Sequence, residues 1–230
     1  MIPKQYVVLK PLIVKASDHG APTTRTRVFF YGYDPKRVAT LTAPDFAPRA
    51  VQDVRVRQAL ACLPAMRATW QTEEESWRAV GKLDDSVFAQ SVIDRVPSGV
   101  GNMDALARLR KKREVSGFLG TLHTKETIRR FSALGPGEAD RISKCTRLDP
   151  NGYCPTLRAG TGPERGSYQA IRPVHPRSPR VISPREGARL QGFPDWFQFH
   201  ATKWHAFRQI GNSVSPIVAE SLLRKIKRSL

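Results

Sequence analysis

Acidic residues are scarce in this sequence. Among its 230 residues, 38 are Lys or Arg and only 20 are Asp or Glu, which gives a formal net charge of +18. This imbalance is extreme for a chain of this size, and it favours a polyanionic partner. Nucleic acid is the most common such partner, while an anionic membrane surface and a ribosome are the alternatives.

Long apolar runs are also missing. The sequence has no stretch of about 18 apolar residues, so it predicts no membrane-spanning helix. Lys10, Pro11 and Lys15 interrupt the apolar stretch near the N-terminus, which argues against a signal peptide. We therefore expect a cytoplasmic protein.

Cysteine is too scarce for a disulfide framework. The sequence contains only Cys62, Cys145 and Cys154, and no two of them have the close spacing of a metal-binding pair. The histidines do not complete a zinc-site spacing with them. We therefore predict no metal site.

The arrangement of apolar residues predicts an α/β fold. Hydrophobic residues make up 40% of the sequence, which is enough for the core of one or two domains. Short apolar runs within residues 5–33 predict buried strands at the edge of a sheet. Residues 45–70 repeat apolar side chains every three or four positions, which predicts a helix. Val218, Leu222 and Ile226 share one face of a predicted final helix.

Residues 182–195, "ISPREGARLQGFPD", contain the start and stop signals of a short helix. Ser183 can act as the N-cap, Pro184 suits the first helical position, and Glu186 completes a capping box. Gly192 supplies the left-handed residue that ends a helix. By itself, such a helix also fits the surface of any soluble protein.

Two arginines precede the apolar run "VFFYG". Arg25 and Arg27 are two residues apart, so in an extended chain they point to the same side. Two guanidinium groups on one side could bind a phosphate, a carboxylate or the carbonyl of a base. Two solvated arginines at the edge of a sheet fit the spacing equally well.

Five basic residues gather within six positions further along the chain. Such a cluster favours phosphate contacts, which give affinity but little sequence information. A solvated helix face is an equal alternative. The cluster comprises Arg108, Arg110, Lys111, Lys112 and Arg113.

Two glycine-containing segments complete the set of candidate sites. Residues 155–176 combine glycines with Arg158 and Arg165, which suits a backbone that approaches DNA closely; an ordinary mobile loop is the alternative. The segment "RQIGNSVSP" places Asn212 and Ser213 just before the final helix, where free amides favour an anion. Turn formation explains these residues equally well.

Taken in order, these segments resemble the C-terminal half of DNA (cytosine-5)-methyltransferases. "DHGAPTTRTRVFFYG" is similar to the eighth conserved motif of that family. "PTLRAGTG" and "RVISPREGARLQGFPDWF" resemble the end of the target-recognition region and the ninth motif, and "FRQIGNSVSP" resembles the tenth. Thr23 departs from the family, which has glutamine there. The resemblance implies the C-terminal part of a Rossmann-like methyltransferase sheet with a smaller mixed target-recognition domain.

The resemblance also implies a division of the chain. Residues 1–44 would form the C-terminal strands of the catalytic domain, and residues 45–177 would form the target-recognition domain. Residues 178–207 would hold the conserved helix and hinge, and residues 208–230 would return to the catalytic domain. The helix residues are implied to be scaffold rather than catalyst: Ser183, Pro184, Arg185, Glu186 and Gly192.

The catalytic motifs of the family are absent from these 230 residues. The family flips a cytosine out of the duplex, attacks it with the Cys of a Pro-Cys motif, and uses the Glu of a Glu-Asn-Val motif. No cysteine here follows a proline, and neither Glu-Asn-Val nor the Phe-x-Gly-x-Gly cofactor loop occurs.

Two interpretations of this absence remain. The chain is the target-recognition subunit of a split methyltransferase, inactive alone, whose second polypeptide carries the missing motifs. Alternatively, it is a non-catalytic DNA-binding module or an inactive remnant. The intact final motifs favour the split enzyme, as do strands that would leave a sheet edge unpaired without a partner.

For the split enzyme, the resemblance implies S-adenosylmethionine as cofactor and double-stranded DNA as substrate. Arg27 would contact the oxygen of the flipped cytosine, and Arg25 would brace the active-site loop of the partner. The basic residues named above would contact DNA, with tRNA as the alternative substrate. The methionine end of the cofactor, shared with the partner, would be bordered by Asn212, Ser213 and Val214.

Overall fold

The computed structural model describes residues 6–48, 51–66, 74–82, 86–94, 96–159 and 172–230. They form a mixed α/β structure, which confirms the predicted fold class. The strands are β1 (Val7–Val8), β2 (Leu12–Lys15), β3 (Thr26–Phe29), β4 (Gly32–Tyr33), β5 (Arg78–Ala79) and β6 (Glu114–Val115). The α-helices are α1 (Val56–Ala59), α2 (Val87–Ala89), α3 (Met103–Lys112), α4 (Lys125–Ala133), α5 (Pro184–Leu190), α6 (Lys203–Asn212) and α7 (Pro216–Ser229).

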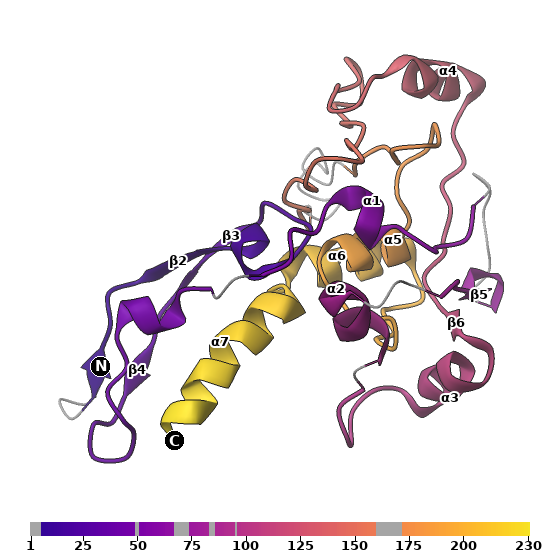
Figure 1. Ribbon diagram of the computed structural model, residues 1–230. Coiled ribbons are helices and arrows are strands. Elements are labelled where there is room, and N and C mark those ends of the chain that lie inside the picture. The colour runs from indigo at the N-terminus through magenta and orange to yellow at the C-terminus, as the bar shows by residue number, and fades with distance from the viewer. Residues whose placement is uncertain (1–5, 49–50, 67–73, 83–85, 95, 160–171) are drawn as a thin grey trace.

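The N-terminal strands pack on the last helix. β2 pairs with β3 in an antiparallel ladder that sets Val14 opposite Arg27, and β1 pairs with β4. Val14 is buried in a small core with Val218 and Leu222 of α7, and Ile226 packs against the same core. Figure 1 shows β2 and β3 running alongside α7. The predicted apolar face of the final helix is therefore confirmed.

The other face of the β2–β3 hairpin is exposed. Ile13 is 77% exposed, Val28 opposite it in the ladder is 53% exposed, and Phe30 is 76% exposed. The prediction that these strands are buried is therefore wrong for this face. The physical reason is that a two-stranded ladder has two faces, and α7 covers only one of them.

Within the described part of residues 45–70, the predicted α-helix is limited to the four residues of α1. Cys62 has a positive φ of 61°, which is incompatible with a continuing right-handed helix. Arg189 donates hydrogen bonds to the carbonyl oxygens of Ala59 and Ala61, at 3.2 and 3.4 Å. The prediction of a longer helix is therefore wrong, because these carbonyls bind the side chain of another helix.

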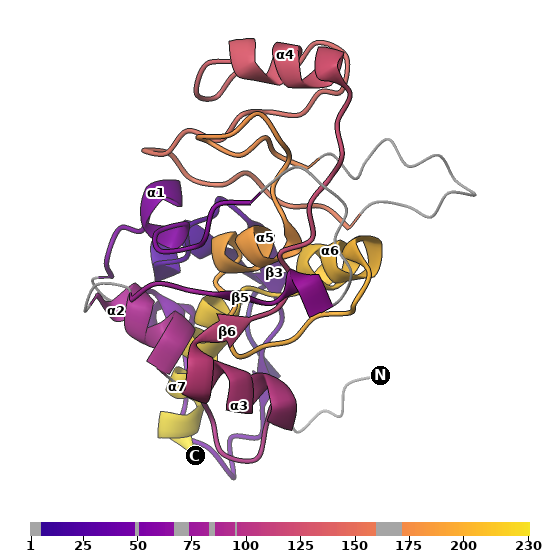
Figure 2. The ribbon, with the colours of Figure 1, turned by 90° about the vertical axis from the view of Figure 1, so that its right-hand side faces the viewer.

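Helix α5 lies at the centre of the molecule (Figure 2). It begins with the capping box that the sequence predicts: the Ser183 hydroxyl accepts a hydrogen bond from the Glu186 amide, and the Glu186 carboxylate accepts one from the Ser183 amide. Gly192, with φ of 82°, follows the helix. The largest apolar core surrounds it and includes Val56 of α1, Phe88 of α2, Ile182, Leu190, Phe207 and Ile210.

Two smaller lobes flank this centre. In the first, β5 pairs with β6, and Leu109 of α3 packs in one core with Val115 of β6 and with Phe118. In the second, α4 packs through Phe131 against Val174 and Val181. In both views α4 lies at the end of the molecule opposite α7 (Figures 1 and 2). None of the helices in the described part of the chain has the length and apolarity needed to span a bilayer.

Candidate functional site

Arg25 joins three segments that are distant in sequence. Its side chain is buried, and its two terminal nitrogens donate to the carbonyl oxygens of Leu157, at 2.9 Å, and Gly211. Burial, together with the nearby charge of Arg27, lowers the pKa of Arg25 to about 10. The guanidinium therefore stays charged at neutral pH and holds the start of β3, residue 157 and the end of α6 together.

Gly211 allows the backbone of residues 158–159 to lie directly against α6. A Cβ atom at this position would lie 2.4 Å from the Ala159 nitrogen, closer than any real contact. Only glycine fits such an approach without a shift of one backbone. The close approach and the Arg25 hydrogen bonds therefore fix the same junction from two sides.

Arg27 remains available at this junction. Its side chain is only partly buried, and it donates a hydrogen bond to the carbonyl oxygen of its own neighbour, Thr26. Thr23, which replaces the glutamine of the motif, is fully buried and accepts a hydrogen bond from the Arg25 amide at 3.3 Å. The pair thus divides into a buried, engaged arginine and a guanidinium that can bind a further group.

The turn between α6 and α7 exposes a carboxamide and an apolar side chain. Asn212 is exposed, and its side chain makes no hydrogen bond within the described part of the chain. Val214 is 38% exposed, and the Ser213 hydroxyl donates to the Ile210 carbonyl at 2.8 Å. The three residues stand together, directly after the Gly211 carbonyl that binds Arg25.

The basic cluster of α3 separates into two groups. Arg108 forms an ion pair with Glu74 at 2.9 Å and stacks on the ring of Trp77. Arg113, with φ of 55°, ends the helix and donates to the carbonyls of residues 80 and 81. These two arginines are engaged within the protein. The exposed members without such contacts among the described residues are Arg110, Lys111 and Lys112.

The glycine-rich segment is described only at its two ends. Arg158 is exposed at the first end, and Arg165 lies outside the described residues. At the second end, the guanidinium of Arg172 stacks on Phe207 of α6, 4.3 Å from the ring centroid, and burial lowers its pKa. Both ends of the segment therefore lie against α6. The sequence alone does not predict this stacking, because Phe207 is distant from Arg172 along the chain.

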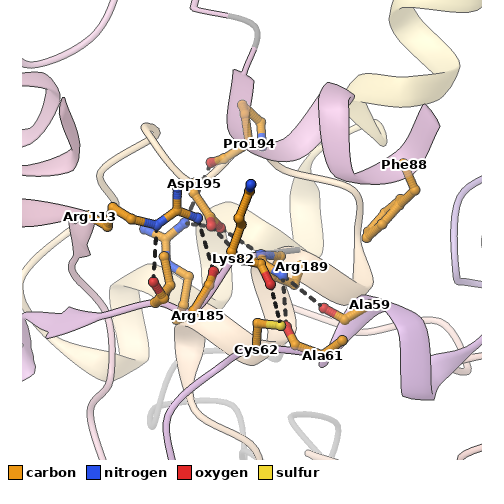
Figure 3. Close-up of polar contacts among 12 residues, drawn as sticks. Ala59, Ala61, Cys62, Lys82, Phe88, Arg113, Arg185, Arg189, Pro194 and Asp195 are labelled. Atoms are coloured by element: carbon orange, nitrogen blue, oxygen red, sulfur yellow. Dashed lines mark hydrogen bonds and ion pairs between the residues drawn. The ribbon is translucent and has the colours of Figure 1, made fainter. Parts of the chain in front are cut away.

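Helix α5 carries a buried ionic cluster that sequence reasoning missed (Figure 3). Arg189 binds both carboxylate oxygens of Asp195, at 2.7 and 2.6 Å, and neither side chain is accessible to solvent. Arg185 donates to the carbonyls of Ser116 and Phe197, and its burial lowers its pKa to about 10. Two arginines in one short helix, closely followed by an acidic residue, are the sequence signal that was available.

The opposite side of α5 holds a second ion pair. Both Glu186 oxygens accept hydrogen bonds from Arg180, at 2.7 and 2.8 Å. Burial would raise the pKa of Glu186, but Arg180 and the amide of Ser183 lower it overall. His175 lies 3.6 Å from the same carboxylate, and its burial lowers its pKa to about 4. The helix residues that were expected to be scaffold are thus fixed by buried charges.

No metal or nucleophile site is evident in the described residues. They contain no cluster of three His, Cys, Asp or Glu side chains that could hold a metal ion. Cys145 and Cys154 are buried, and burial raises the pKa of both thiols. A raised pKa disfavours the thiolate that acts as nucleophile. Cys62 is exposed and donates to the carbonyl of Lys82.

Comparison with known proteins places this arrangement in one family. The model of the C-5 cytosine-specific DNA methylases matches residues 5–228. The chain is 35% identical to the type II methyltransferase M.XorII of Xanthomonas oryzae pv. oryzae over 97% of its length, and 25% identical to M.DdeI of Desulfomicrobium norvegicum over 94%. It spans about half of these relatives, 51% and 53% of their respective lengths.

A solved structure has the same fold. The crystal structure of a prophage-encoded E. coli protein, described as a DNA modification methyltransferase, is 46% identical and superposes with a TM-score of 0.89. The match covers 99% of this chain and 62% of that one. The chain therefore belongs to the C-5 cytosine-specific DNA methylase family.

Proposed function

We propose that this chain is the target-recognition part of a DNA (cytosine-5)-methyltransferase whose nucleophile is supplied by a second polypeptide. The assembled enzyme would transfer a methyl group from S-adenosylmethionine to carbon 5 of a cytosine flipped out of duplex DNA. The observation that carries this proposal is the junction at Arg25 and Arg27. It presents at the matched motif the partly exposed guanidinium of Arg27, whose one hydrogen bond among the described residues is to the carbonyl of Thr26, while no cysteine of the chain follows a proline.

Arg27 would act on the cytosine itself. Addition of a thiolate from the partner to carbon 6 places negative charge on the ring and its carbonyl oxygen. A guanidinium that donates to that oxygen stabilises the charge as it develops. The ring would then take the methyl group at carbon 5, and the sulfonium sulfur of the methyl donor would leave as a neutral thioether. Transfer of the carbon 5 proton to a base would expel the thiolate and restore the aromatic ring.

Arg25 would be a positioning residue. Its terminal nitrogens are engaged by the carbonyls of Leu157 and Gly211, so they are not free to brace a loop of the partner. Its Nε is also buried, without a hydrogen-bond partner among the described residues, so no donor of this guanidinium is open to a partner chain. Through these bonds Arg25 would hold β3, and with it Arg27, against the C-terminal helices.

The cofactor would lie at the turn between α6 and α7. S-adenosylmethionine supplies the methyl group when it is bound. The exposed carboxamide of Asn212 can bind its polar methionine end, and Val214 offers apolar contact beside it. Ser213, which donates its own proton to Ile210, can still accept a hydrogen bond. These residues would form this chain's share of a site completed by the partner.

The exposed face of the β2–β3 hairpin supports the need for a partner. Ile13 and Val28 are exposed opposite each other on the two-stranded ladder, and the exposed Phe30 directly follows β3. Such surfaces are ordinarily covered, because an exposed apolar strand promotes aggregation. The catalytic half of the enzyme would cover these side chains, which agrees with a chain that spans about half of its relatives.

DNA would contact the basic residues that remain free at the surface. Arg110, Lys111 and Lys112 on α3, and Arg158 near the junction, have no ion-pair partner among the described residues. Such side chains suit phosphate oxygens. Arg165 stays a prediction, because it lies outside the described residues.

The test is methyl transfer from labelled S-adenosylmethionine to duplex DNA, measured for this chain alone, for the product of the adjacent reading frame alone, and for their mixture. Activity is expected only in the mixture. Activity of this chain alone would show that it carries its own nucleophile and would overturn the split enzyme. No activity in any tube, with DNA binding retained, would instead favour a non-catalytic DNA-binding module.

A further inference from the structure

A short hairpin in the α4 lobe presents a shaped basic tip. Residues 137–147 fold back on themselves: the Asp140 amide donates to the Cys145 carbonyl at 2.9 Å, and the Arg147 amide donates to the Glu138 carbonyl at 2.8 Å. Ala139 and Thr146 face each other in an antiparallel bridge. The tip therefore comprises Arg141, Ile142, Ser143 and Lys144.

The tip is held from inside by Asp140. One carboxylate oxygen accepts hydrogen bonds from the Ser143 amide and hydroxyl, at 2.7 and 2.6 Å, and the other accepts one from Arg130 of α4 at 3.0 Å. Lys144 adopts a φ of 58°, a left-handed conformation that few non-glycine residues take. A backbone fixed by so many contacts is pre-organised for binding.

Three of the four side chains of the tip are exposed, and in the described part of the chain only that of Ser143 is engaged, through its hydrogen bond to Asp140. Arg141 and Lys144 are exposed and form no ion pair within the described residues, and Ile142 is 68% exposed. One rigid turn therefore exposes an apolar side chain together with two cations. Phosphate binding alone requires the charges but not the isoleucine.

The lobe around the tip carries more positive than negative charge: residues 124–149 contain six Lys or Arg side chains and four carboxylates. Each acidic side chain between residues 124 and 149 accepts a hydrogen bond or forms an ion pair: Glu126 and Asp140 with Arg130, Glu138 with the amide of residue 135, and Asp149 with that of residue 151. On α4, Lys125 and Arg129 are exposed one helical turn apart, without such partners. The tip therefore projects from a surface that attracts a polyanion.

We infer that residues 141–144 enter the major groove of duplex DNA and read bases there, an inference that rests on the proposed function only for its choice of DNA as partner. Arg141 has the two parallel donors that suit guanine, and Ile142 has the apolar surface that suits the methyl group of thymine. Lys144 reaches a phosphate beside the groove. The tip thereby contributes to the choice of site, whereas Arg110, Lys111 and Lys112 contribute affinity.

The test selects preferred sequences from a randomised duplex pool with the full chain, and then measures Kd on the preferred duplex. Arg141→Ala should weaken that binding about tenfold and remove the preference at one base pair. Ile142→Ala should change the selected base at one position. Matched controls are Arg228→Ala and Leu223→Ala, two exposed residues of α7 at the other end of the molecule; both should keep the selected sequence.

Asp140→Asn separates shape from charge. It removes one negative charge from the protein, so attraction by charge alone predicts equal or tighter binding. If the hydrogen bonds of Asp140 fix the shape of the tip, their loss should weaken binding to the preferred duplex several-fold and leave binding to random DNA unchanged. A melting curve identifies a variant that fails to fold, and Ser143→Ala then replaces it, because it removes one of the same hydrogen bonds at an accessible position.

The outcomes distinguish the inference from the proposed function. Equal losses for Arg141→Ala and Arg228→Ala, with the selected sequence unchanged, would overturn base reading by the tip and leave the methyltransferase proposal standing. No sequence preference in the wild-type chain would also overturn it. Failure of the wild-type chain to bind any duplex would count against both.

Discussion

The guanidinium of Arg25 binds the carbonyl oxygen of Gly211, so a residue at the start of a strand is tied to the end of a helix 186 positions later in the chain. The same guanidinium binds Leu157, and Gly211 leaves room for the backbone beside it. This junction brings together three segments that the sequence resemblance could only place in order. It also leaves Arg27 as the member of the arginine pair that is free to act.

Gly211→Ala should destabilise the protein, although alanine is the better helix former. Helix propensity alone would favour alanine by about 1 kcal/mol. The added Cβ would lie 2.4 Å from the Ala159 nitrogen, and relieving that overlap should cost about 1 to 3 kcal/mol. Urea unfolding measures the change, with Asn212→Ala at the exposed neighbouring position as control. A stabilised Gly211→Ala variant would show that the two backbones are not in contact.

The two arginines should fail in different ways when replaced. In the assembled enzyme, Arg27→Ala should lower kcat by about 100-fold or more, as for loss of one transition-state donor, while DNA binding stays within a few-fold of wild type. Arg25→Ala should lower stability by about 3 kcal/mol, since it removes buried charged hydrogen bonds. Single-turnover rates, Kd and melting curves separate the two effects. Equal loss of binding and rate with Arg27→Ala would contradict its contact with the cytosine.

DNA binding by this chain should weaken steeply with salt. Each phosphate that the protein neutralises contributes about −0.9 to the slope of the logarithm of the DNA-association constant against the logarithm of the salt concentration. Replacing Arg110, Lys111 and Lys112 with alanine should therefore reduce the slope by about 0.9 for each phosphate that is no longer bound. The matched pair Arg108→Ala and Arg113→Ala should change the slope little and lower stability instead, because both arginines bind within the protein. A slope that does not depend on these positions would place the DNA on another surface.

Stability should fall as the pH drops below about 6.5, partly through His175. Burial holds the pKa of this histidine at about 4 in the folded state, whereas an unfolded histidine has a pKa of about 6.5. Between these values the unfolded state binds the extra proton, so unfolding becomes easier by up to about 1.4 kcal/mol for each pH unit. The stability that neutral His175 contributes to the folded state is fully present above pH 6.5 and is lost as the pH falls to about 4.

His175→Asn is the matched variant for this effect. Asparagine keeps an acceptor for the Arg177 amide, which now binds Nδ1 of His175 at 3.1 Å, but it cannot titrate. The variant should therefore show a flatter loss of stability between pH 6.5 and 4.5 in urea unfolding. His19 and His123, whose pKa values burial also lowers, are present in both proteins and cancel in the difference. Parallel pH profiles for the two proteins would rule out the buried, neutral form of His175.

Local signals predicted the parts of the fold that local contacts determine. The ends of α5 follow from Ser183, Glu186 and Gly192, which bond to or shape their own neighbours, and the face of α7 follows from its apolar spacing. The predicted helix over residues 45–70 failed because its carbonyls bind Arg189, which is 130 positions from Ala59 in sequence. No local pattern reports such a partner.

The candidate site shows the same division. The sequence shows the arginine pair, but the spacing of the two residues does not predict which of them is buried and which stays available for binding. Burial by Leu157 and Gly211 is what separates Arg25 from Arg27. Likewise, the sequence does not distinguish Arg108 and Arg113 from their basic neighbours. In the structure Arg108 pairs with Glu74, and Arg113 donates to the carbonyls of residues 80 and 81. A composition can predict a basic surface, but the pairing of each charge depends on the tertiary structure.

The packing of the first strands on α7 sets an order of events during folding. The His19 ring meets Ser221 across 202 positions, and Lys225 donates to the Ala47 carbonyl across 178. Contacts between such distant positions form slowly, because a long loop must close first. During synthesis, β2 and β3 leave the ribosome well before α7, so both faces of the hairpin stay uncovered until α7 is made. The apolar side chains that α7 later covers, Val14 among them, therefore stay exposed on the nascent chain until synthesis is nearly complete.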